Sequence, residues 1–250
     1  MISLKNSKEI ALMRQAGRIS ARALQLGGEA VRPGVTTAHI NKVIHDYIIS
    51  QGAQPNFLGL YGFPASACIS VNDTVIHGIP STAEVVHEGD IVSIDTGALY
   101  KGWHGDNAGT FVAGTASPEA LRLIEVTRQS FYEGLKVAVV GNRIGDISHA
   151  IQQYVEANGF SVVREYVGHG LGRELHEDPE VPNYGHPGRG ARLVPGMTLA
   201  IEPMVNAGGV AIRQLPDGWT VKTKDGSLSA HYEKSIVITA NGPVILTDPE

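Results

Sequence analysis

Apolar residues recur at helical spacing in four stretches of the chain, and residues that favour helix ends bound each stretch. Ser7 is the expected N-cap of the first helix, and the Gly27-Gly28 pair is its expected end. Ser117 followed by Pro118 marks the start of the third helix. The predicted helices span residues 7–28, 36–52, 117–138 and 145–159. The buried side of the third is expected to comprise Leu121, Ile124, Phe131 and Leu135.

Runs of β-branched and aromatic residues between these helices predict strands. The expected strands cover residues 67–71, 160–167, 197–205 and 230–238, together with a hairpin over 91–112. The segment 55–64 is rich in glycine and aromatic residues, which is typical of a loop. The chain is therefore predicted to have a mixed α/β (α+β) fold.

A repeat with an offset of 107 residues relates the two halves of the chain. Pairs at this offset include Ile40 and Ile147, Gly52 and Gly159, and Asp95 and Glu202. Chance matches of glycine and isoleucine are common, so the repeat is supporting information only. One offset that relates a helix, a helix end and an acidic strand indicates a single domain. Its two similar halves, roughly 1–115 and 116–250, are expected to face each other.

The hairpin carries two carboxylates in what is otherwise a core strand pair. If Tyr100 and Lys101 are the two turn residues, Asp95 and Asp106 stand directly opposite each other on one face. The Cβ atoms of opposed residues lie about 4.5–5.5 Å apart, so two ionised carboxylates repel unless a cation lies between them. A metal-bridging pair removes that conflict. A solvent-facing acidic hairpin is the alternative, and a bulge would shift the register.

Two further acids interrupt apolar strands. Glu202 lies within the run 197–205, and Glu233 lies within the run 230–238. An ionised carboxylate in a low-dielectric core needs a cation, strong donors or protonation. Lys234 is adjacent to Glu233, but the alternation of a strand turns its side chain to the opposite face.

One histidine adds a nitrogen donor to these acids. His169 lies between two glycines and is expected to present its imidazole at a tight turn. A lone histidine in a loop is more often a surface residue than a ligand. The candidate metal ligands are Asp95, Asp106, His169, Glu202 and Glu233. Such an oxygen-rich set suits two divalent ions of the Mn, Fe, Co or Zn kind, and the four carboxylates would balance their charge.

Composition limits the other functions that the chain can have. Its 250 residues are 42% hydrophobic and 18% charged, as is ordinary for a globular protein. The formal net charge is −5 and no lysine or arginine block occurs, so stable nucleic-acid binding is not expected. Cys68 is the only cysteine, which suits a reducing compartment. No signal peptide or long apolar run is found, so we expect a cytoplasmic protein without membrane association.

Several segments resemble type I methionine aminopeptidases, in order and over essentially the whole chain. They are Val75–Pro80, Ile94-Asp95 with His104–Asp106, Gly168–Gly172 with His176–Pro179, Ala200–Asn206, and Asp217–Val221 with Glu233. The short distance from Glu202 to Glu233 leaves no room for the helical insertion of the type II enzymes. The resemblance implies a pita-bread fold, in which helices cover a curved antiparallel sheet with internal pseudo-twofold symmetry.

The resemblance also implies roles for individual residues. The five candidate ligands would hold the two ions, with Asp106 and Glu233 bridging both. His77 and His176 would contact the substrate, His176 stabilising the tetrahedral intermediate and His77 the scissile amide. Glu202 would be the proton shuttle for the attacking water, a role that needs only short proton transfers.

An apolar cup is expected to accept the unbranched thioether side chain of methionine. Its candidate residues are Phe57, Leu60, Phe63, Cys68 and Trp219. Three positions depart from the pattern of the resembled enzymes. Phe57 stands where several members have cysteine, Leu175 where some have phenylalanine, and Lys234 where histidine is common. These departures concern the shape of the pocket and not the ligand set.

The function implied is removal of the initiator methionine from nascent or newly released polypeptides when the second residue is small. We expect transient proximity to the ribosome and a monomeric chain. One alternative is an Xaa-Pro aminopeptidase or prolidase of the same fold, although those enzymes usually carry an additional amino-terminal domain. A non-catalytic binding module of this fold is the other alternative. Such modules typically lack part of the ligand set, and no member of the set is missing here.

Overall fold

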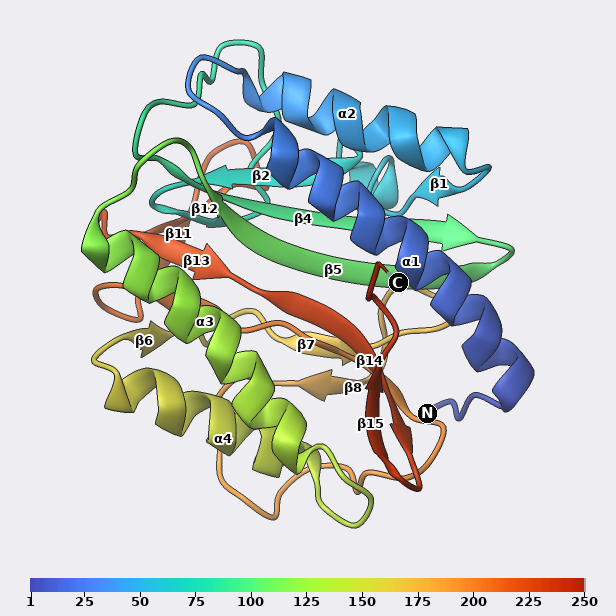
Figure 1. The fold of residues 1–250 in the computed structure, drawn as a ribbon. Coiled ribbons are helices and arrows are strands. Elements are labelled where there is room, and N and C mark those ends of the chain that lie inside the picture. The colour runs from blue at the N-terminus through green and yellow to red at the C-terminus, as the bar shows by residue number, and fades with distance from the viewer. Residues whose placement is uncertain (250) are drawn as a thin grey trace.

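Two pairs of α-helices lie against a curved, largely antiparallel sheet in the computed structural model, which describes residues 1–249 (Figure 1). The helices are α1 (Ser7–Ala30), α2 (Thr37–Ser50), α3 (Pro118–Val137) and α4 (Ile144–Ala157), and a 3-10 turn covers Leu60–Gly62. In Figure 1 both pairs lie in front of the sheet, α1 and α2 above and α3 and α4 below. The predicted fold class, α/β with helices that cover a curved sheet, is confirmed. No helix in the described part of the chain is long and apolar enough to cross a membrane.

The strands form one large sheet and two small ones. The large sheet has the order β1-β4-β5-β14-β9-β7-β8, with β2 beside β4 and β15 beside β14. Its strands are β1 (Gln54–Pro55), β2 (Ala67–Val71), β4 (Ile91–Tyr100), β5 (Trp103–Val112), β7 (Gly168–Gly170), β8 (Glu177–Val181), β9 (Thr198–Ile201), β14 (Glu233–Thr239) and β15 (Gly242–Ile245). The small sheets comprise β3 (Thr74–Ile76), β6 (Ser161–Val162), β10 (Met204–Asn206), β11 (Ile212–Gln214), β12 (Val221–Thr223) and β13 (Ser229–His231).

Each helix pair buries its own apolar core against the sheet. Ile40, Ile44 and Ile48 of α2 pack with Ile69 of β2 and Ile94 of β4. The second core joins α3 and α4 to β9 and β14. Because side chains alternate along a strand, the neighbour of buried Ile94, Asp95, is turned to the other face of the sheet. The helices therefore cover one face, and the acids lie on the face that they leave open.

Helix α1 begins and ends differently from the prediction. Asn6, and not Ser7, is its N-cap, because the Asn6 side chain accepts from the backbone of Lys8 and Glu9 while the Glu9 side chain accepts from Asn6. The helix also runs past the Gly27-Gly28 pair to Ala30. A Cβ on Gly28 would lie 2.1 Å from the Phe111 ring. These glycines therefore permit close packing and do not end the helix.

Helix α3 begins at the predicted residues but buries a different stripe. Ser117 is its N-cap and Pro118 its first residue, as predicted. Leu121 was expected on the buried side, yet it is 51% exposed, whereas Leu123 is fully buried. Two residues along a helix turn the side chain by about 200°, so Leu123 and Leu121 face opposite directions. Phe131 is buried as predicted.

The β4–β5 hairpin has a register two residues away from the predicted one. Lys101 and Gly102, with φ of 52° and 76°, form its turn, as a primed two-residue turn requires. Asp95 therefore pairs with Ala108 and Asp106 with Gly97, so the two acids are diagonal neighbours and not direct partners. A register shift of two residues leaves each side chain on the same face of the sheet, because side chains alternate with a period of two. Both acids still point to the same side of the sheet.

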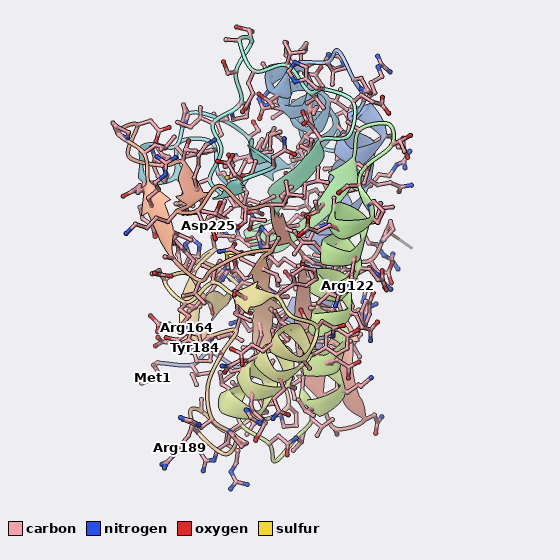
Figure 2. The ribbon with its side chains drawn as sticks, turned by 90° about the vertical axis from the view of Figure 1, so that its left-hand side faces the viewer. Met1, Arg122, Arg164, Tyr184, Arg189 and Asp225 are labelled. Atoms are coloured by element: carbon pink, nitrogen blue, oxygen red, sulfur yellow. The ribbon has the colours of Figure 1, made fainter. Side chains whose placement is uncertain are left out.

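The region after α4 contains less strand than predicted. Only Ser161–Val162 of the expected strand 160–167 is extended in a sheet, where it pairs with β10. Two arginine–aromatic contacts hold this part of the molecule together. The Arg122 guanidinium lies 5.0 Å from the Phe160 ring centroid, and that of Arg164 lies 5.2 Å from the Tyr184 ring centroid (Figure 2). These contacts tie the end of α4 to α3 and to the loop that follows β8.

Candidate metal centre and adjoining cavity

Five adjacent strands of the large sheet each bring one candidate ligand to the same cavity. Asp95 comes from β4, Asp106 from β5, Glu233 from β14, Glu202 from the position after β9, and His169 from β7. The cavity has a volume of about 540 Å³, and all five side chains line it. Strand pairing therefore unites residues that are far apart in the sequence, and both halves of the chain contribute.

Small residues pair with the acids across the neighbouring strands. Ala108 pairs with Asp95 on one side and with Glu233 on the other. Gly97 pairs with Asp106, and a Cβ there would lie 2.0 Å from the Asn56 amide nitrogen. Ala108 therefore places only a methyl group between Asp95 and Glu233, and Gly97 makes room for the Asn56 amide. The five candidate ligands are called the floor of the cavity below.

His169 lies in strand β7 and not at the tight turn that its flanking glycines had suggested. A Cβ on Gly168 would lie 2.3 Å from the Ala200 carbonyl oxygen, and one on Gly170 would lie 2.1 Å from that of Asp178. The two glycines therefore allow β7 to lie close to its neighbouring strands. This close approach explains the Gly-His-Gly sequence better than a turn does.

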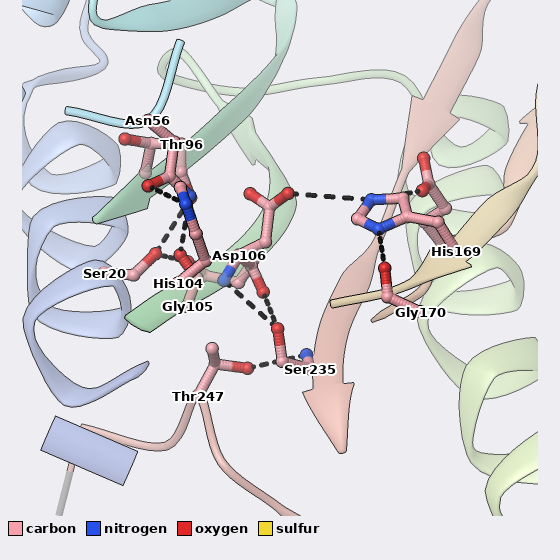
Figure 3. Close-up of polar contacts among 12 residues, drawn as sticks. Ser20, Asn56, Thr96, His104, Gly105, Asp106, His169, Gly170, Ser235 and Thr247 are labelled. Atoms are coloured by element: carbon pink, nitrogen blue, oxygen red, sulfur yellow. Dashed lines mark hydrogen bonds and ion pairs between the residues drawn. The ribbon is translucent and has the colours of Figure 1, made fainter. Parts of the chain in front are cut away.

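The orientation of the His169 ring leaves one nitrogen free for a ligand. Its Nδ1 lies 2.8 Å from the Gly170 carbonyl oxygen, which can only accept, so Nδ1 carries the proton (Figure 3). The other nitrogen, Nε2, lies 3.8 Å from Asp106 Oδ2 and 3.6 Å from Glu202 Oε1. These separations are too long for hydrogen bonds, and they suit atoms that share a cation.

The backbone of Asp106 is held from two sides. The Ser235 hydroxyl donates to the Asp106 carbonyl oxygen at 2.7 Å and accepts from the Asp106 amide at 3.1 Å (Figure 3). Asn56 donates to the carbonyl oxygen of Gly105 at 3.1 Å, and its Oδ1 lies 2.9 Å from His104 Nδ1. These bonds fix the strand and leave the Asp106 carboxylate itself free to face the cavity.

The acids have no lysine or arginine as partner in residues 1–249. The ion pairs of Asp106 and Glu202 involve only histidines, and Lys234 Nζ instead donates to the Thr247 carbonyl oxygen at 3.0 Å. Asp95 Oδ1, Asp106 Oδ1 and Glu233 Oε1 are buried without a hydrogen-bond partner. Buried carboxylates of this kind need a cation or a proton.

Burial raises the pKa of each of these acids. Desolvation is the main cause for Asp95, Asp106, Glu202 and Glu233, and the negative charges of neighbouring acids raise the pKa further for three of them, Asp95, Glu202 and Glu233. A divalent cation would bind the unpartnered carboxylate oxygens and the lone pair of His169 Nε2. It would also offset the repulsion between the acids. The residues fit a metal centre.

His231 is a member of this site that the sequence reasoning did not identify. The described residues contain two groups of donors that could each hold an ion, namely Asp106, His169 and Glu233, and Glu202, His231 and Glu233. His231 Nε2 lies 3.7 Å from Glu202 Oε2. Its position was readable from the sequence, because residues two apart along extended chain share a face.

His77 and His176 line the same cavity next to the acids. His77 has a positive φ of 59°, which is uncommon for a residue other than glycine and often accompanies a functional site. The following Gly78 permits this path, since a Cβ there would lie 2.2 Å from the Ile69 carbonyl oxygen. The ring centroid of His176 is 4.5 Å from that of His169. Both histidines are therefore near the carboxylate floor.

Burial keeps the histidines of the cavity neutral. It lowers the pKa of His77 to about 4, with a further contribution from His176, and it lowers the pKa of His176 as well. The same cause lowers the pKa of His231 to about 3. Neutral imidazoles can donate hydrogen bonds to a polar substrate.

The predicted apolar cup forms one cluster beside the acids. Phe57, Phe63, Cys68 and Leu175 are buried in it, and Leu60 and Trp219 pack against them. The rings of Phe63 and Trp219 meet edge to face at a centroid distance of 5.1 Å. Burial and the nearby Asp95 raise the pKa of the Cys68 thiol, so it remains an uncharged lining group. All five predicted cup residues line the cavity.

Two aromatic residues of the cavity rim were not predicted. The Tyr61 ring is stacked at 6.2 Å on that of His176, and the Tyr166 ring meets that of His77 edge to face at 5.5 Å. Tyr61 is 78% exposed and has a φ of 50°. The sequence carries no signal that separates Tyr61 from the other aromatic residues of its loop, whereas Tyr166 precedes the histidine-bearing strand by two residues.

Comparisons with known proteins agree with this geometry. The sequence model of metallopeptidase family M24 matches residues 11–240. The chain is 58% identical over 247 residues to a methionine aminopeptidase of Clostridium perfringens, with 99% of each chain covered. It is 50% identical to methionine aminopeptidase 1 of Bacillus subtilis, again with 99% of each covered.

Solved structures give the same result at the level of the fold. The methionine aminopeptidase of Thermotoga maritima is 46% identical and superposes with a TM-score of 0.98, with 99% of this chain and 100% of that chain covered. A prolidase of Pyrococcus furiosus has a TM-score of 0.79 and is 23% identical, with 99% of this chain and 66% of that chain covered. The likeness to the prolidase concerns the fold alone. The resemblance that the sequence motifs had indicated is confirmed.

Proposed function

The chain belongs to metallopeptidase family M24, and we propose that it removes the N-terminal methionine of nascent or newly released polypeptides whose second residue is small. One observation carries this proposal. Four acids and one histidine from five adjacent strands meet, without lysine or arginine partners, directly beside an apolar cup. A metal-dependent hydrolase needs the first feature, and selection of an apolar N-terminal side chain needs the second.

The five residues on the floor would hold two divalent metal ions. Four carboxylates would balance the charge of two divalent cations, and the mixed oxygen and nitrogen donors suit Mn, Fe, Co or Zn. When bound, such ions polarise a carbonyl group and lower the pKa of water. The His169 ring supports this assignment, since the Gly170 carbonyl holds the proton on Nδ1 and leaves Nε2 unprotonated.

Three side chains are proposed to act on the substrate. Glu202 takes a proton from the attacking water and passes it to the leaving amine, and its place among the candidate ligands keeps both proton transfers short. His176 donates a hydrogen bond to the oxygen of the tetrahedral intermediate, and His77 contacts the scissile amide. Both imidazoles are neutral, so each can donate from one nitrogen without adding charge to the site.

The apolar cup is proposed to hold the methionine side chain. Phe57, Leu60, Phe63, Cys68 and Trp219 present aromatic, aliphatic and thiol surfaces that suit a flexible thioether. The register of β2 and β4 supports this placement, because Cys68 pairs directly with Asp95. A side chain in the cup would therefore place its own peptide bond beside the acids.

Several properties of the whole protein remain part of this proposal. We infer one catalytic domain of two related halves, 1–115 and 116–250, that acts as a monomer in the cytoplasm. Transient proximity to the ribosome would follow from its substrate, the N-terminus of a new polypeptide. Sedimentation of the purified protein tests the monomer, and co-sedimentation with ribosomes tests the proximity.

A short peptide panel tests the proposed activity. The metal-loaded protein should release methionine from Met-Ala-Ser, act far less on Met-Leu-Ser, and leave Ala-Pro-Ser intact. Cleavage of Ala-Pro-Ser with no action on Met-Ala-Ser would instead identify an Xaa-Pro peptidase. No cleavage of any peptide by protein that binds divalent ions would favour a binding module.

A further inference from the structure

His231 is a buried histidine beside the carboxylate floor, and no role in the proposed reaction uses it. Its side chain is 2% exposed, and its Nε2 atom has no hydrogen-bond partner in the described structure. That nitrogen lies 3.7 Å from Glu202 Oε2. A buried, unpartnered polar atom is costly, so an atom aimed at a carboxylate in this way calls for an explanation.

The backbone holds His231 firmly in this position. Its amide donates to Thr110 Oγ1 at 2.9 Å, and the Thr110 hydroxyl donates back to the His231 carbonyl oxygen at 2.9 Å. On the other side, His231 pairs with Met204 between strands β13 and β10. Strand pairing with β10 and the two hydrogen bonds to Thr110 therefore fix the His231 ring beside Glu202.

The carboxylate of Glu202 lies between two imidazoles. Its Oε1 faces His169 Nε2 at 3.6 Å, and its Oε2 faces His231 Nε2 at 3.7 Å. The two histidines differ in one respect. The carbonyl oxygen of Gly170 fixes the tautomer of His169, so that its Nε2 presents a lone pair. No such carbonyl contacts a ring nitrogen of His231 in residues 1–249, so its Nε2 is free to carry the proton.

We propose that His231 is a positioning residue, which donates from Nε2–H to Oε2 of Glu202 and thereby turns Oε1 toward His169 and the cation. This inference rests on the proposed function, because it concerns the same metal centre. A carboxylate that gives one oxygen to a metal ion is commonly held through the other by a hydrogen-bond donor. A shift of the Glu202 carboxyl group by less than 1 Å brings the 3.7 Å separation into hydrogen-bond range.

Two amide substitutions test whether Glu202 needs a hydrogen-bond donor at the position of His231 Nε2, or only a polar side chain nearby. His231→Gln places an amide N–H group near the position of Nε2, whereas His231→Asn is one methylene shorter and does not reach Glu202. Both variants keep a polar side chain of moderate size at a buried position. The control is His149→Asn, since His149 lies on α4 and contacts the Gly185 carbonyl oxygen, away from the acids.

The readout is the affinity of metal-stripped protein for Mn²⁺, measured by titration calorimetry, with circular dichroism to verify folding. His231→Asn should lower the affinity by about 10- to 100-fold, the usual effect of removing a partner of a metal-binding side chain. His231→Gln should stay within about 3-fold of wild type, and so should His149→Asn. The Co²⁺ absorption spectrum of His231→Gln should match that of wild type, because the atoms bound to the ion do not change.

Three results would overturn the inference. Equal affinity of His231→Asn and wild type would show that Glu202 needs no donor. A His231→Gln variant as weak as His231→Asn, with an altered Co²⁺ spectrum, would make His231 a metal ligand and not a positioning residue. Wild-type protein that bound neither ion would overturn the proposed metal centre itself, which distinguishes that failure from the first two.

Discussion

The floor and the wall of the cavity are built from different kinds of structure. The four acids and the histidine of the floor come from five adjacent strands, and hydrogen bonds between strands fix their relative positions. The aromatic residues of the wall lie mainly on the loop that follows β1, where Leu60–Gly62 forms a single 3-10 turn. They are held by packing against one another and against Trp219.

This difference places the catalytic groups on the sheet and the residues that select the substrate side chain mainly on a loop. A rigid sheet can hold charged groups at the spacing that catalysis requires, and a loop can change its side chains without moving that sheet. Changes in the floor should therefore reduce turnover for every substrate. Changes in the wall should alter which side chain is accepted and leave turnover largely intact.

The largest effect is expected for Glu202→Ala, in the floor. Loss of the proposed proton shuttle should lower kcat by about 10³-fold, because general acid–base groups contribute about 10²- to 10⁴-fold. Circular dichroism should show a folded protein. Glu156→Ala, an exposed acid on α4, is the control and should retain normal kcat. Normal turnover in Glu202→Ala would refute the assigned role.

The second effect concerns the support of the segment that carries His176. Lys5 is almost fully buried and forms an ion pair with Glu177, the residue after His176, with side chains 3% and 15% exposed. Lys5→Met would leave that carboxylate without its cation and should lower the free energy of unfolding by about 3 kcal/mol. Urea denaturation measures this change.

Two variants make the test of Lys5 specific. Lys8→Met removes an exposed lysine three residues away and should change the free energy of unfolding by less than about 0.5 kcal/mol. The double variant Lys5→Met with Glu177→Gln should recover part of the loss, since no unpaired charge then remains. Equal stability of Lys5→Met and wild type would contradict the importance of the ion pair.

A smaller effect is expected in the wall. Trp219→Ala removes the ring that packs on Phe63 and should raise KM for Met-Ala-Ser by about 10-fold, with kcat changed by less than about 3-fold. Leu58→Ala is the control, because Leu58 lies in the loop that carries Phe63 but is 50% exposed. A fall in kcat without a rise in KM would show that floor and wall are not separable.

A further effect is the pH dependence of stability without metal ions. The folded-state pKa values of the four acids lie above their unfolded values of 3.8 for Asp and 4.5 for Glu. The folded protein therefore binds more protons than the unfolded chain, and stability falls as pH rises through the raised values. Above about pH 7.5 the cavity histidines are almost entirely neutral in both states and add little to this dependence.

Thermal unfolding of the metal-free protein between about pH 7.5 and pH 9 measures this dependence. Its Tm should fall with pH. The fall is equivalent to about 1.4 kcal/mol per pH unit for each carboxyl group that is protonated in the folded protein and ionised in the unfolded chain. Glu233→Gln should weaken the fall, and divalent ions should remove it. A Tm that rises with pH in metal-free protein would mean that the acids are not strained.

The sequence was sufficient to find the acids, and less so to place them. Buried carboxylates in apolar strands are rare enough to be noticed without coordinates, and the alternation of a strand predicted the face of Lys234 correctly. The predicted hairpin register is wrong because its turn is Lys101-Gly102 and not Tyr100-Lys101, and a glycine at the second position favours the observed turn. The prediction that Asp95 and Asp106 share one face of the sheet is still correct, because the register differs by two residues and side chains alternate with a period of two.

The sequence does not distinguish glycines that end a helix or form a turn from glycines that allow close packing. Gly27-Gly28 and Gly168 with Gly170 were interpreted as a helix end and a turn, yet they allow close packing against Phe111 and between strands. Those contacts are between residues distant in the chain, so local patterns cannot reveal them. His231 was missed for the opposite reason, since its signal was local and simply lay beside the stronger signal of Glu233.

The most direct test of the account is anomalous X-ray diffraction from crystals grown with Mn²⁺. The account predicts two anomalous peaks about 3–4 Å apart, enclosed by Asp95, Asp106, His169, Glu202 and Glu233. Crystals without an anomalous peak among these residues, in which the acids keep their protons or pair with lysine or arginine, would contradict it.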